Sequence, residues 1–265
     1  MTRDDNPQWR IARVVENRPV ARGSMWLTLE ANDGEAAAFE PGHVLGLGIE
    51  QSGGEYLRHA YTVTRGDPYR RRFSHVYRVI SGGRLTPQLE KMQPGEFLCF
   101  HGPGHTPIQK EVQAQASRIA GLATGTGIGP LYGYAEKTLS EGERRLITLY
   151  VGMREETDIC LRDELEFLRE RYANFSYHFT LTRPGPSWKG RHGRLTHTVP
   201  LLLGRLHDLH VHLVGNGEMV HLVRPALYEA GIPRDRVSIE TYFNHHAKPD
   251  PAAIKALAER FRTRV

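Results

Sequence analysis

A glycine-rich turn at residues 124–130 constrains the fold of this chain more than any other feature. Its sequence, Thr-Gly-Thr-Gly-Ile-Gly-Pro, follows an apolar run and precedes an apolar-periodic segment at 131–139. Because Gly125, Gly127 and Gly129 carry no side chain, backbone N–H groups can approach an anion there. Pro130 suits the first position of a helix, whose amino terminus attracts phosphate. The turn predicts a strand, a tight loop and a helix that together bind phosphate.

A plainer interpretation of the same turn stays open. The spacing is G-x-G-x-G-P, which is neither the G-x-G-x-x-G dinucleotide fingerprint nor a P-loop, since no G-K-[ST] follows. The glycines would also serve a turn that only packs a helix closely against a sheet. The surrounding segments therefore have to decide between the two.

Composition excludes several classes of protein. Of 265 residues, 39% are hydrophobic and 25% are charged, which is typical of a globular chain rather than a disordered one. The first residues lack the apolar region of a signal peptide, and no apolar run is long enough to span a bilayer. Cys99 and Cys160 are too few for a cysteine-ligated iron–sulfur site or a disulfide framework. We expect a cytoplasmic protein without a membrane span.

The balance of charge is basic, with 35 Lys and Arg against 30 Asp and Glu. Such a balance favours anionic ligands or an acidic partner. The basic residues are nevertheless scattered, and the one tight run, Arg70-Arg71-Arg72, is typical of a solvated loop. We therefore expect no nucleic-acid partner.

The first half of the chain alternates short apolar runs with turn residues. We expect six strands there, at 11–15, 24–29, 44–49, 60–64, 74–80 and 96–100. Short strands with Gly and Pro turns predict an all-β domain, a six-stranded antiparallel Greek-key barrel. A short helix begins near Thr86, which can cap it. We place this domain at residues 1–112, ending inside an irregular connector at 101–117.

The second half changes to an alternation of strands and helices. Strands are expected at 119–124, 146–151, 175–181, 211–214 and 237–243, and helices at 131–139, 162–171, 196–203 and 219–229. This order predicts an α/β domain at 113–247 with a doubly wound, parallel, five-stranded sheet. The chain then continues into a helical extension at 248–265, which Asp250 can cap. Ligands of such sheets bind at the carboxyl ends of the strands, where Gly125, Gly152, Arg183 and Gly215 fall.

Four local patterns lie on this framework. They are Arg58-His59-Ala60-Tyr61-Thr62-Val63, Val76-Tyr77-Arg78-Val79 with Gly82-Gly83-Arg84-Leu85-Thr86, the glycine turn, and Leu213-Val214-Gly215-Asn216-Gly217-Glu218-Met219-Val220. With Glu240-Thr241-Tyr242-Phe243, they resemble the ferredoxin–NADP reductase family over nearly the whole chain.

The resemblance implies that the barrel binds FAD. In the family's R-x-Y-[ST] motif the Tyr lies against the flavin and the hydroxyl residue reaches flavin N5, roles that fall to Tyr61 and Thr62. His59 stands where the family has the phosphate-binding Arg, and Arg58 lies one residue earlier. The glycine pair lets backbone approach the pyrophosphate. The implied FAD-binding set is Arg58, His59, Tyr61, Thr62, Val63, Val76, Arg78, Gly82, Gly83, Leu85, Thr86, Tyr242 and Phe243.

The resemblance also implies a pyridine-nucleotide site in the α/β domain. Arg183 and Arg194 stand where NADPH-preferring members bind the 2′-phosphate, so we expect NADP rather than NAD. Val214 replaces the family cysteine beside the nicotinamide, which keeps an apolar wall there. The implied NADP-binding set is Thr124, Gly125, Thr126, Gly127, Gly152, Arg154, Thr182, Arg183, Arg194, Gly215, Asn216 and Met219.

The activity that the resemblance implies is that of an oxidoreductase, a flavoprotein in which the cofactor carries the redox chemistry. Hydride would pass between NADPH and FAD, and single electrons would pass to a separate ferredoxin or flavodoxin. Thr62 would hydrogen-bond flavin N5, Glu240 would lie near the ring, and Tyr242, rather than Phe243, would cover its other face. We expect a monomer.

Other functions remain open from the sequence. The chain could be the reductase component of an oxygenase, or a reductase of free flavin. The valine at 214 and the displaced arginine also suit a regulatory or electron-transfer subunit with little hydride transfer.

A serine hydrolase is excluded because no G-x-S-x-G elbow exists. Histidines at 207, 210, 212, 245 and 246 lack converging thiol or carboxylate support, so we expect no metal site.

Overall fold

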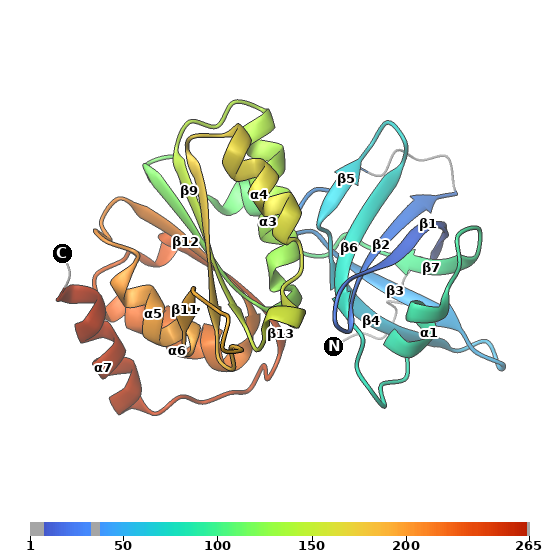
Figure 1. The fold of residues 1–265 in the computed structure, drawn as a ribbon. Helices are drawn as coiled ribbons and strands as arrows, with labels where there is room; N and C mark the ends of the chain where they lie inside the picture. The colour runs from blue at the N-terminus through green and yellow to red at the C-terminus, as the bar shows by residue number, and fades with distance from the viewer. Residues whose placement is uncertain (1–7, 33–37, 264–265) are drawn as a thin grey trace, which may run out of the picture. The chain divides into compact units, whose positions relative to one another are not determined.

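The structure is a computed structural model that describes residues 8–32 and 38–263 (Figure 1). The first seven residues, which bear on the prediction about targeting, lie outside the described part. The chain divides into two compact units, residues 1–107 and 108–265. The division falls after Pro107, whereas the sequence places it after residue 112, and the C-terminal extension belongs to the second unit.

The first unit is built on an antiparallel sheet of seven strands in the order β4-β3-β7-β1-β2-β6-β5. The six expected strands are confirmed, and the three-residue β5 is an addition. The strands are β1 (Arg10–Ala21), β2 (Ser24–Ala31), β3 (Val44–Glu50), β4 (Tyr56–Thr62), β5 (Arg65–Asp67), β6 (Arg72–Arg78) and β7 (Phe97–His101).

Hydrogen bonds bring the two ends of this sheet together. The ring Nδ1 of His75 on β6 lies 2.9 Å from the carbonyl oxygen of Thr62 on β4. The backbone N–H of Val76 donates to Thr64 Oγ1 at 3.2 Å. The sheet thereby closes into the expected barrel, which removes the exposed edges of an open sheet.

Alternate residues of the strands fill the barrel, as the two-residue period of a strand requires. Leu27 and Leu29 on β2, and Leu45 and Leu47 on β3, have no exposed surface. The rings of Phe39, Phe73 and Phe100 pack edge-on or tilted against one another, with centroids 5.0 to 6.0 Å apart. Burying this apolar surface supplies the main driving force for folding of the unit.

Helix α1 (Thr86–Lys91) follows the barrel's glycine pair, but Thr86 does not cap it. Thr86 is the first helical residue, and Leu85 occupies the cap position without a side-chain bond. The Thr86 hydroxyl instead accepts a hydrogen bond from the Ile80 N–H at 2.9 Å. The prediction of a capping threonine is wrong because its hydroxyl closes the preceding loop.

The second unit contains a parallel sheet of six strands in the order β11-β10-β9-β8-β12-β13. The five expected strands are confirmed, and the two-residue β11 extends one edge. The strands are β8 (Arg118–Thr124), β9 (Leu146–Met153), β10 (Phe175–Leu181), β11 (Arg191–His192), β12 (Leu209–Asn216) and β13 (Val237–Phe243). The strand order reverses at β8, which places a topological switch point between β8 and β12.

Helices connect these strands and cover both faces of the sheet (Figure 1). They are α2 (Ile108–Glu111), α3 (Ile128–Ser140), α4 (Arg162–Arg171), α5 (Leu195–Thr198), α6 (Gly217–Glu229) and α7 (Pro251–Arg262). Short 3₁₀ turns are η1 (Gly125–Gly127), η2 (Glu156–Asp158), η3 (Val199–Leu201) and η4 (Arg234–Arg236). Among the described residues, none of these helices is long and apolar enough to cross a membrane.

Three helical predictions need correction. Pro130 is the third residue of α3, still within the first turn, where its missing N–H costs no helical bond. The expected helix at 196–203 is divided into α5 and η3, because Pro200 cannot donate to the preceding turn. The connector contains the one-turn helix α2 where irregular structure was expected.

The C-terminal extension is an integral part of the second core. Asp250 accepts the Ala252 N–H at 3.0 Å, which confirms the predicted cap of α7. Leu257, Ala258 and Phe261 are buried in one cluster with residues of α6 such as Val223. The extension therefore leaves β13, runs along the unit and packs its helix on α6 (Figure 1).

We predict that Phe261→Ala lowers the free energy of unfolding by about 3–5 kcal/mol, the usual cost of emptying a buried aromatic site. Denaturant unfolding of the full chain measures it. The exposed Lys255 on the same helix supplies the control, and Lys255→Ala should change stability little. Equal stability of the two variants would show that α7 is not part of the core.

Candidate functional site

The ends of β8 and β12 are joined at the switch point. Thr124 Oγ1 accepts a hydrogen bond from the Asn216 N–H at 2.8 Å. Gly215 has a φ of +125°, and a Cβ added to it would lie 2.3 Å from Thr124 Oγ1. No residue with a side chain fits at 215 without separating the two strands.

The glycine turn uses its glycines for two different purposes. A Cβ on Gly127 would lie 2.8 Å from the carbonyl oxygen of Val214, so this glycine packs the turn against β12. Gly125 has a φ of +57° and open space where its Cβ would be. The packing interpretation is therefore confirmed at Gly127, and the open space at Gly125 is compatible with the phosphate interpretation. The first N–H groups of the helical turns that follow lack helical partners and suit an anion.

Gly152 at the end of β9 completes this crevice. A Cβ there would lie 3.2 Å from Leu195 Cβ and 3.5 Å from Thr124 Cγ2. The structure thus brings together Thr124, Gly125, Gly127, Gly152, Gly215 and Asn216, as the sequence predicts for the carboxyl ends of neighbouring strands. Met219 lies instead in the core beneath α6 with 6% of its surface exposed.

Basic side chains follow β9 and β10. The Arg183 N–H donates to the Arg154 carbonyl at 2.7 Å, and the Thr182 N–H donates to the Met153 carbonyl at 3.1 Å. Both arginine side chains are exposed, and neither forms an ion pair with another described residue. Arg194 precedes α5, and its guanidinium lies 3.7 Å from Glu218 Oε2. Arg154 and Arg183 are therefore the pair available to a phosphate.

A bulge ends the last strand. Thr241 pairs with Gly215 and Phe243 pairs with Asn216, so Tyr242 is the extra residue between them. A bulge bends the strand and redirects a side chain. Tyr242 is half-buried, whereas 52% of the Phe243 surface is exposed. Glu240 lies opposite Val214 and is also half-buried.

Asn244 joins this strand end to the start of α6, which the sequence analysis missed. Its Nδ2 donates to Asn216 Oδ1 at 3.1 Å, and the same oxygen accepts the Glu218 N–H at 3.0 Å. A Cβ on Gly217 would lie 2.1 Å from the Asn244 carbonyl oxygen. The turn after β12 and the bulge of β13 are thus fixed to each other.

In the first unit, the end of β4 presents an aromatic group beside a buried histidine. The Tyr61 ring lies edge-on to the rings of His75 and Tyr77, with centroids 6.2 and 6.1 Å away. Burial raises the pKa of the Tyr61 hydroxyl, so this group remains protonated. Thr62 is buried behind it and is held through its carbonyl by His75. His75 was not among the residues predicted from the sequence, because it lies among other polar residues of β6 such as Ser74 and carries no distinctive local pattern.

The other predicted residues of β4 and β6 differ in exposure. Arg58 and His59 are exposed next to each other, whereas Val63 and Val76 are buried in the barrel. The Arg78 guanidinium donates to the Arg22 carbonyl at 2.8 Å and to Ser24 Oγ at 3.4 Å. Arg78 is therefore engaged by the barrel's own backbone.

The loop before α1 is closed by its own hydrogen bonds. The Gly83 N–H donates to the Ile80 carbonyl at 2.9 Å, and the Thr86 hydroxyl closes the loop on the Ile80 N–H. Gly82 has a φ of +75° with open space beside it. The N–H groups of Arg84 and Leu85 donate to no other described residue. Two unpaired donors beside a bare glycine fit a phosphate group.

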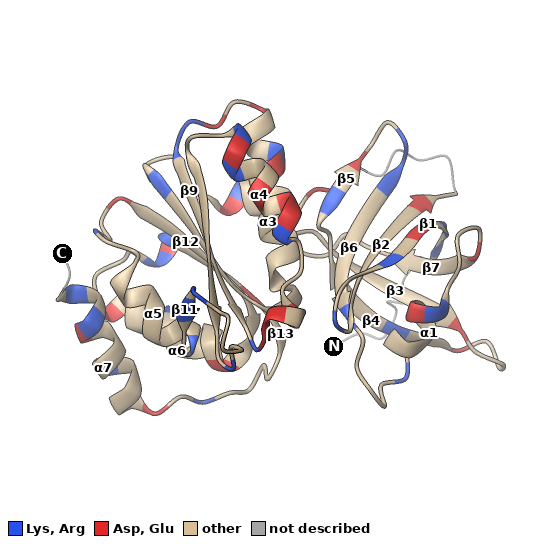
Figure 2. Cartoon of the chain, viewed as in Figure 1, with Lys and Arg blue, Asp and Glu red and all other residues tan. Residues whose placement is uncertain are grey.

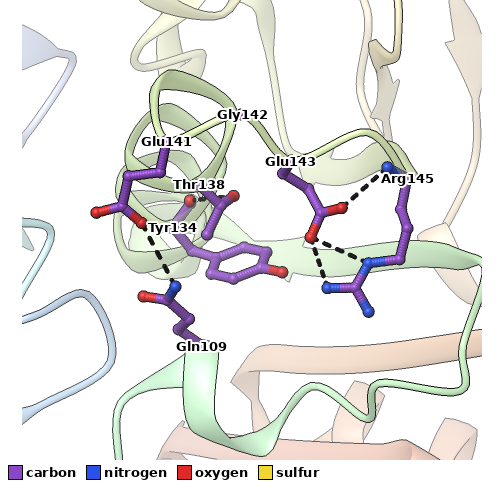
Figure 3. A pocket seen from close by; sticks show the side chains of 7 residues that line it. All are labelled: Gln109, Tyr134, Thr138, Glu141, Gly142, Glu143 and Arg145. Carbon is purple, nitrogen blue, oxygen red and sulfur yellow. Dashed lines mark hydrogen bonds and ion pairs between the residues drawn. The ribbon is translucent and has the colours of Figure 1, made fainter.

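A separate pocket of about 330 Å³ lies at the opposite end of the second sheet (Figure 3). Tyr134 and Thr138 of α3, Gln109 of α2 and the turn before β9 line it. Gln109 donates to Glu141 at 3.4 Å, and Arg145 is paired with Glu143. This pocket precedes β9 and so lies apart from the crevice at the strand ends.

The clustered histidines serve the fold. His210 accepts the Gln113 N–H at 3.4 Å through Nδ1 and lies 2.9 Å from Ser238 Oγ through Nε2. His212 Nδ1 lies 3.4 Å from a carboxylate oxygen of Glu111. Across the described part of the chain, no three His, Cys, Asp or Glu side chains are arranged to hold a metal.

Charge is dispersed over both units. In Figure 2, Lys and Arg alternate with Asp and Glu on helices, strands and turns alike. Many of these charges are paired, as Arg118 is with Asp208 at 2.8 Å and Arg72 is with Glu30 at 2.8 Å. The Arg118 hydrogen bonds lower the pKa of Asp208 to about 2. The arginines at the ends of β9 and β10 are among those that have no such partner in the described part of the chain.

Comparison with known proteins gives three findings. The family described as "Oxidoreductase NAD-binding domain" matches residues 122–225, which include the glycine turn and the Gly215 motif. Ferredoxin–NADP reductase B of Sorangium cellulosum is 35% identical over 87% of this chain and 96% of its own length. An anthranilate 1,2-dioxygenase electron transfer component of Acinetobacter baylyi is 26% identical over 59% of this chain, which spans 45% of that protein.

The fold has solved counterparts as well. A ferredoxin–NADP⁺ reductase from Neisseria gonorrhoeae, whose structure holds FAD and NADP, superposes with a TM-score of 0.77. It shares 17% identity and covers 89% of this chain and 99% of its own. The predicted combination of a barrel and a parallel α/β sheet is therefore confirmed.

We predict that the stability of the barrel falls on acidification because His75 is buried. Burial lowers the pKa of His75 to about 4 from its ordinary 6.5. The unfolded chain binds a proton here before the folded chain does, so the free energy of unfolding falls between pH 6.5 and 4, by up to about 3 kcal/mol.

His75→Phe tests this expectation. Denaturant unfolding at pH 7 and pH 4.5 should show a smaller acid loss in the variant than in the parent chain. His210, whose pKa burial also lowers to about 4, is present in both proteins and cancels from the comparison. An unchanged pH dependence would mean that His75 is not the buried neutral group.

Proposed function

This chain belongs to the ferredoxin–NADP reductase family, and we propose that it transfers hydride between NADPH and a bound FAD and passes single electrons to a separate ferredoxin or flavodoxin. The observation that carries the proposal is that one chain contains two loops with backbone N–H groups suited to phosphate, together with the half-buried Tyr61. These two loops, which we call anion cradles, are the loop at 80–86 and the turn at 124–127.

The residues of the first unit fit FAD. Gly82 leaves room for a phosphate, and the N–H groups of Arg84 and Leu85 are available to it. The ring of Tyr61, which packs edge-on against His75 and Tyr77, offers a flat apolar surface to the isoalloxazine ring of FAD. His59 and Arg58 are exposed on the same strand and could reach the second phosphate. When bound, FAD supplies the redox chemistry, accepting a hydride and releasing electrons singly.

The residues of the second unit fit NADPH. The glycine turn would bind the pyrophosphate, with Thr126 and Asn216 at its sides, and Arg154 and Arg183 would bind the 2′-phosphate. Arginine suits this role because its guanidinium makes paired hydrogen bonds to phosphate oxygens. Val214 is fully buried behind Gly127, so it shapes the crevice from behind.

The protein's part in hydride transfer is positioning. Thr62 would orient the flavin through a hydrogen bond, and Glu240 would supply a polar group near the flavin ring. Tyr242, at the bulge, would cover the flavin face until the nicotinamide displaces it. The C-terminal extension does not cover Phe243, whose ring is about half exposed. Helix α7 of the extension packs on α6 instead. Holding FAD and NADPH in position in this way would make hydride transfer between them an effectively unimolecular step.

A partner protein is proposed on electrostatic grounds. The chain carries a net charge of +5, and an acidic ferredoxin or flavodoxin would be attracted to it. The likeness to an oxygenase electron transfer component keeps a second candidate, the reductase component of an oxygenase.

Steady-state oxidation of NADPH with different acceptors tests the choice of partner. Reduction of ferredoxin or flavodoxin should be faster than reduction of free flavin and should slow as salt is raised. Faster reduction of free flavin would instead support a flavin reductase. Activity only with an oxygenase would support the second candidate.

We predict that Tyr61→Ala weakens FAD binding about tenfold, because a stacking surface is lost. Equilibrium dialysis of the chain against FAD measures it. The matched control is Tyr69→Ala, since Tyr69 is 98% exposed at the tip of the β5–β6 hairpin and should leave FAD binding unchanged. Equal retention of FAD by both variants would remove Tyr61 from the proposed site.

We predict that Arg183→Ala raises the KM for NADPH about tenfold and the KM for NADH far less. The variant removes a charged donor that only the 2′-phosphate would use. Arg144→Ala, an exposed arginine in the turn before β9, serves as the control. Equal changes for NADPH and NADH would remove the case for Arg183.

A further inference from the structure

We infer that Glu156 is a positioning residue for the 2′-phosphate, because its carboxylate holds the Gly185 N–H and thereby directs Arg183 toward Arg154. The inference rests on the proposed function and adds a residue that the NADP-binding set lacks. It concerns the loop at 182–190, between β10 and β11.

The contact itself is well defined. Glu156 lies in η2, just after β9, and its two carboxylate oxygens lie 2.9 and 3.1 Å from the Gly185 nitrogen. A hydrogen bond to an ionised carboxylate is stronger than one between neutral groups. A Cβ on Gly185 would lie 3.2 Å from Glu156 Oε1, so the backbone and the carboxylate approach each other closely. The bond joins the segments that carry Arg154 and Arg183.

The tether from this anchor to Arg183 is short and stiff. Only Pro184 separates Arg183 from Gly185, and Pro186 follows. Each proline fixes its own φ, and the residue before a proline is restricted as well. Arg183 is also held on its other side by its N–H bond to the Arg154 carbonyl. Fixing Gly185 therefore fixes the direction in which Arg183 leaves the sheet.

The rest of the loop is built around Trp188. Its backbone N–H donates to the Gly185 carbonyl at 3.1 Å, and its Nε1 donates to the Arg191 carbonyl at 3.0 Å. The Arg162 guanidinium lies over its ring at 5.9 Å. The loop is thus ordered through its far end, while the Thr182 hydroxyl, 3.5 Å from the Met153 carbonyl, and the Glu156 carboxylate join its start to the end of β9 and the turn that follows.

The same contact engages a carboxylate that follows β9. An acidic side chain just after the second strand of such a sheet can accept a hydrogen bond from a ribose 2′-hydroxyl, which favours NADH. Glu155 is committed to a capping box with Asp158, and Glu156 is committed to Gly185. Both carboxylates thus accept from backbone N–H groups, whereas the side chains of Arg154 and Arg183 are exposed.

Three substitutions separate position from charge. Glu156→Ala removes both, Glu156→Asp keeps the charge but shortens the reach, and Glu156→Gln keeps the reach and an acceptor oxygen without the charge. The control is Glu170→Ala, an exposed glutamate of α4. The probes are adenosine 2′,5′-bisphosphate and AMP, titrated into the full chain by calorimetry. Thermal melting confirms that each variant is folded.

The inference predicts that the alanine and aspartate variants bind adenosine 2′,5′-bisphosphate about tenfold more weakly, with AMP changed less than about twofold. The glutamine and Glu170 variants should bind as the parent does. In kinetics, the KM for NADPH should rise with kcat unchanged.

Other outcomes overturn it. If Glu156→Ala and Glu156→Asp both bind adenosine 2′,5′-bisphosphate as the parent does, Glu156 has no role in the site. If Glu156→Gln binds it more tightly and Glu156→Asp loses no affinity, Glu156 acts only through its charge. An equal loss for both probes would mean general loosening of the unit. If the parent chain binds neither probe, the proposed nucleotide site fails together with the inference.

Discussion

The close approach of β8 to β12 is the constraint on which the second unit depends. Thr124 and Gly215 meet so tightly that a single methyl group at 215 would overlap the threonine hydroxyl. Gly127 packs on the Val214 carbonyl in the same way. At Gly125, by contrast, there is open space where a Cβ would be, so the backbone of the turn is accessible there. A backbone wall of this kind is suited to a pyrophosphate.

The first unit depends on a comparable contact of a different kind. His75 is neutral and buried, and it joins β6 to the carbonyl of Thr62 at the end of β4. The bond helps to close the barrel and fixes the two residues that the family places at the flavin. A leucine or phenylalanine there would fill the space but could not hold the carbonyl. His75 thus contributes to barrel closure and holds the backbone of a residue that we propose lies at the flavin.

The alternation of apolar and turn residues was enough to predict every long strand and the fold class of both units. It also predicted that Gly125, Gly152 and Gly215 lie near one another, since parallel strands end at one edge of the sheet. It could not predict the bulge at Tyr242, because a bulge depends on the register between β12 and β13 rather than on local pattern. The role of the Thr86 hydroxyl and the pairing of Glu156 with Gly185 were missed for the same reason, as both depend on segments brought together by the fold.

The central claim is that one chain binds a flavin in its barrel and a pyridine nucleotide at its parallel sheet, and that the two react. The most direct measurement is an absorbance spectrum of the purified protein, recorded anaerobically before and after NADPH is added. The account predicts the visible bands of an oxidised flavin, which bleach on addition of NADPH. A colourless protein that cannot be reconstituted with FAD, or flavin bands that NADPH leaves unchanged, would contradict it.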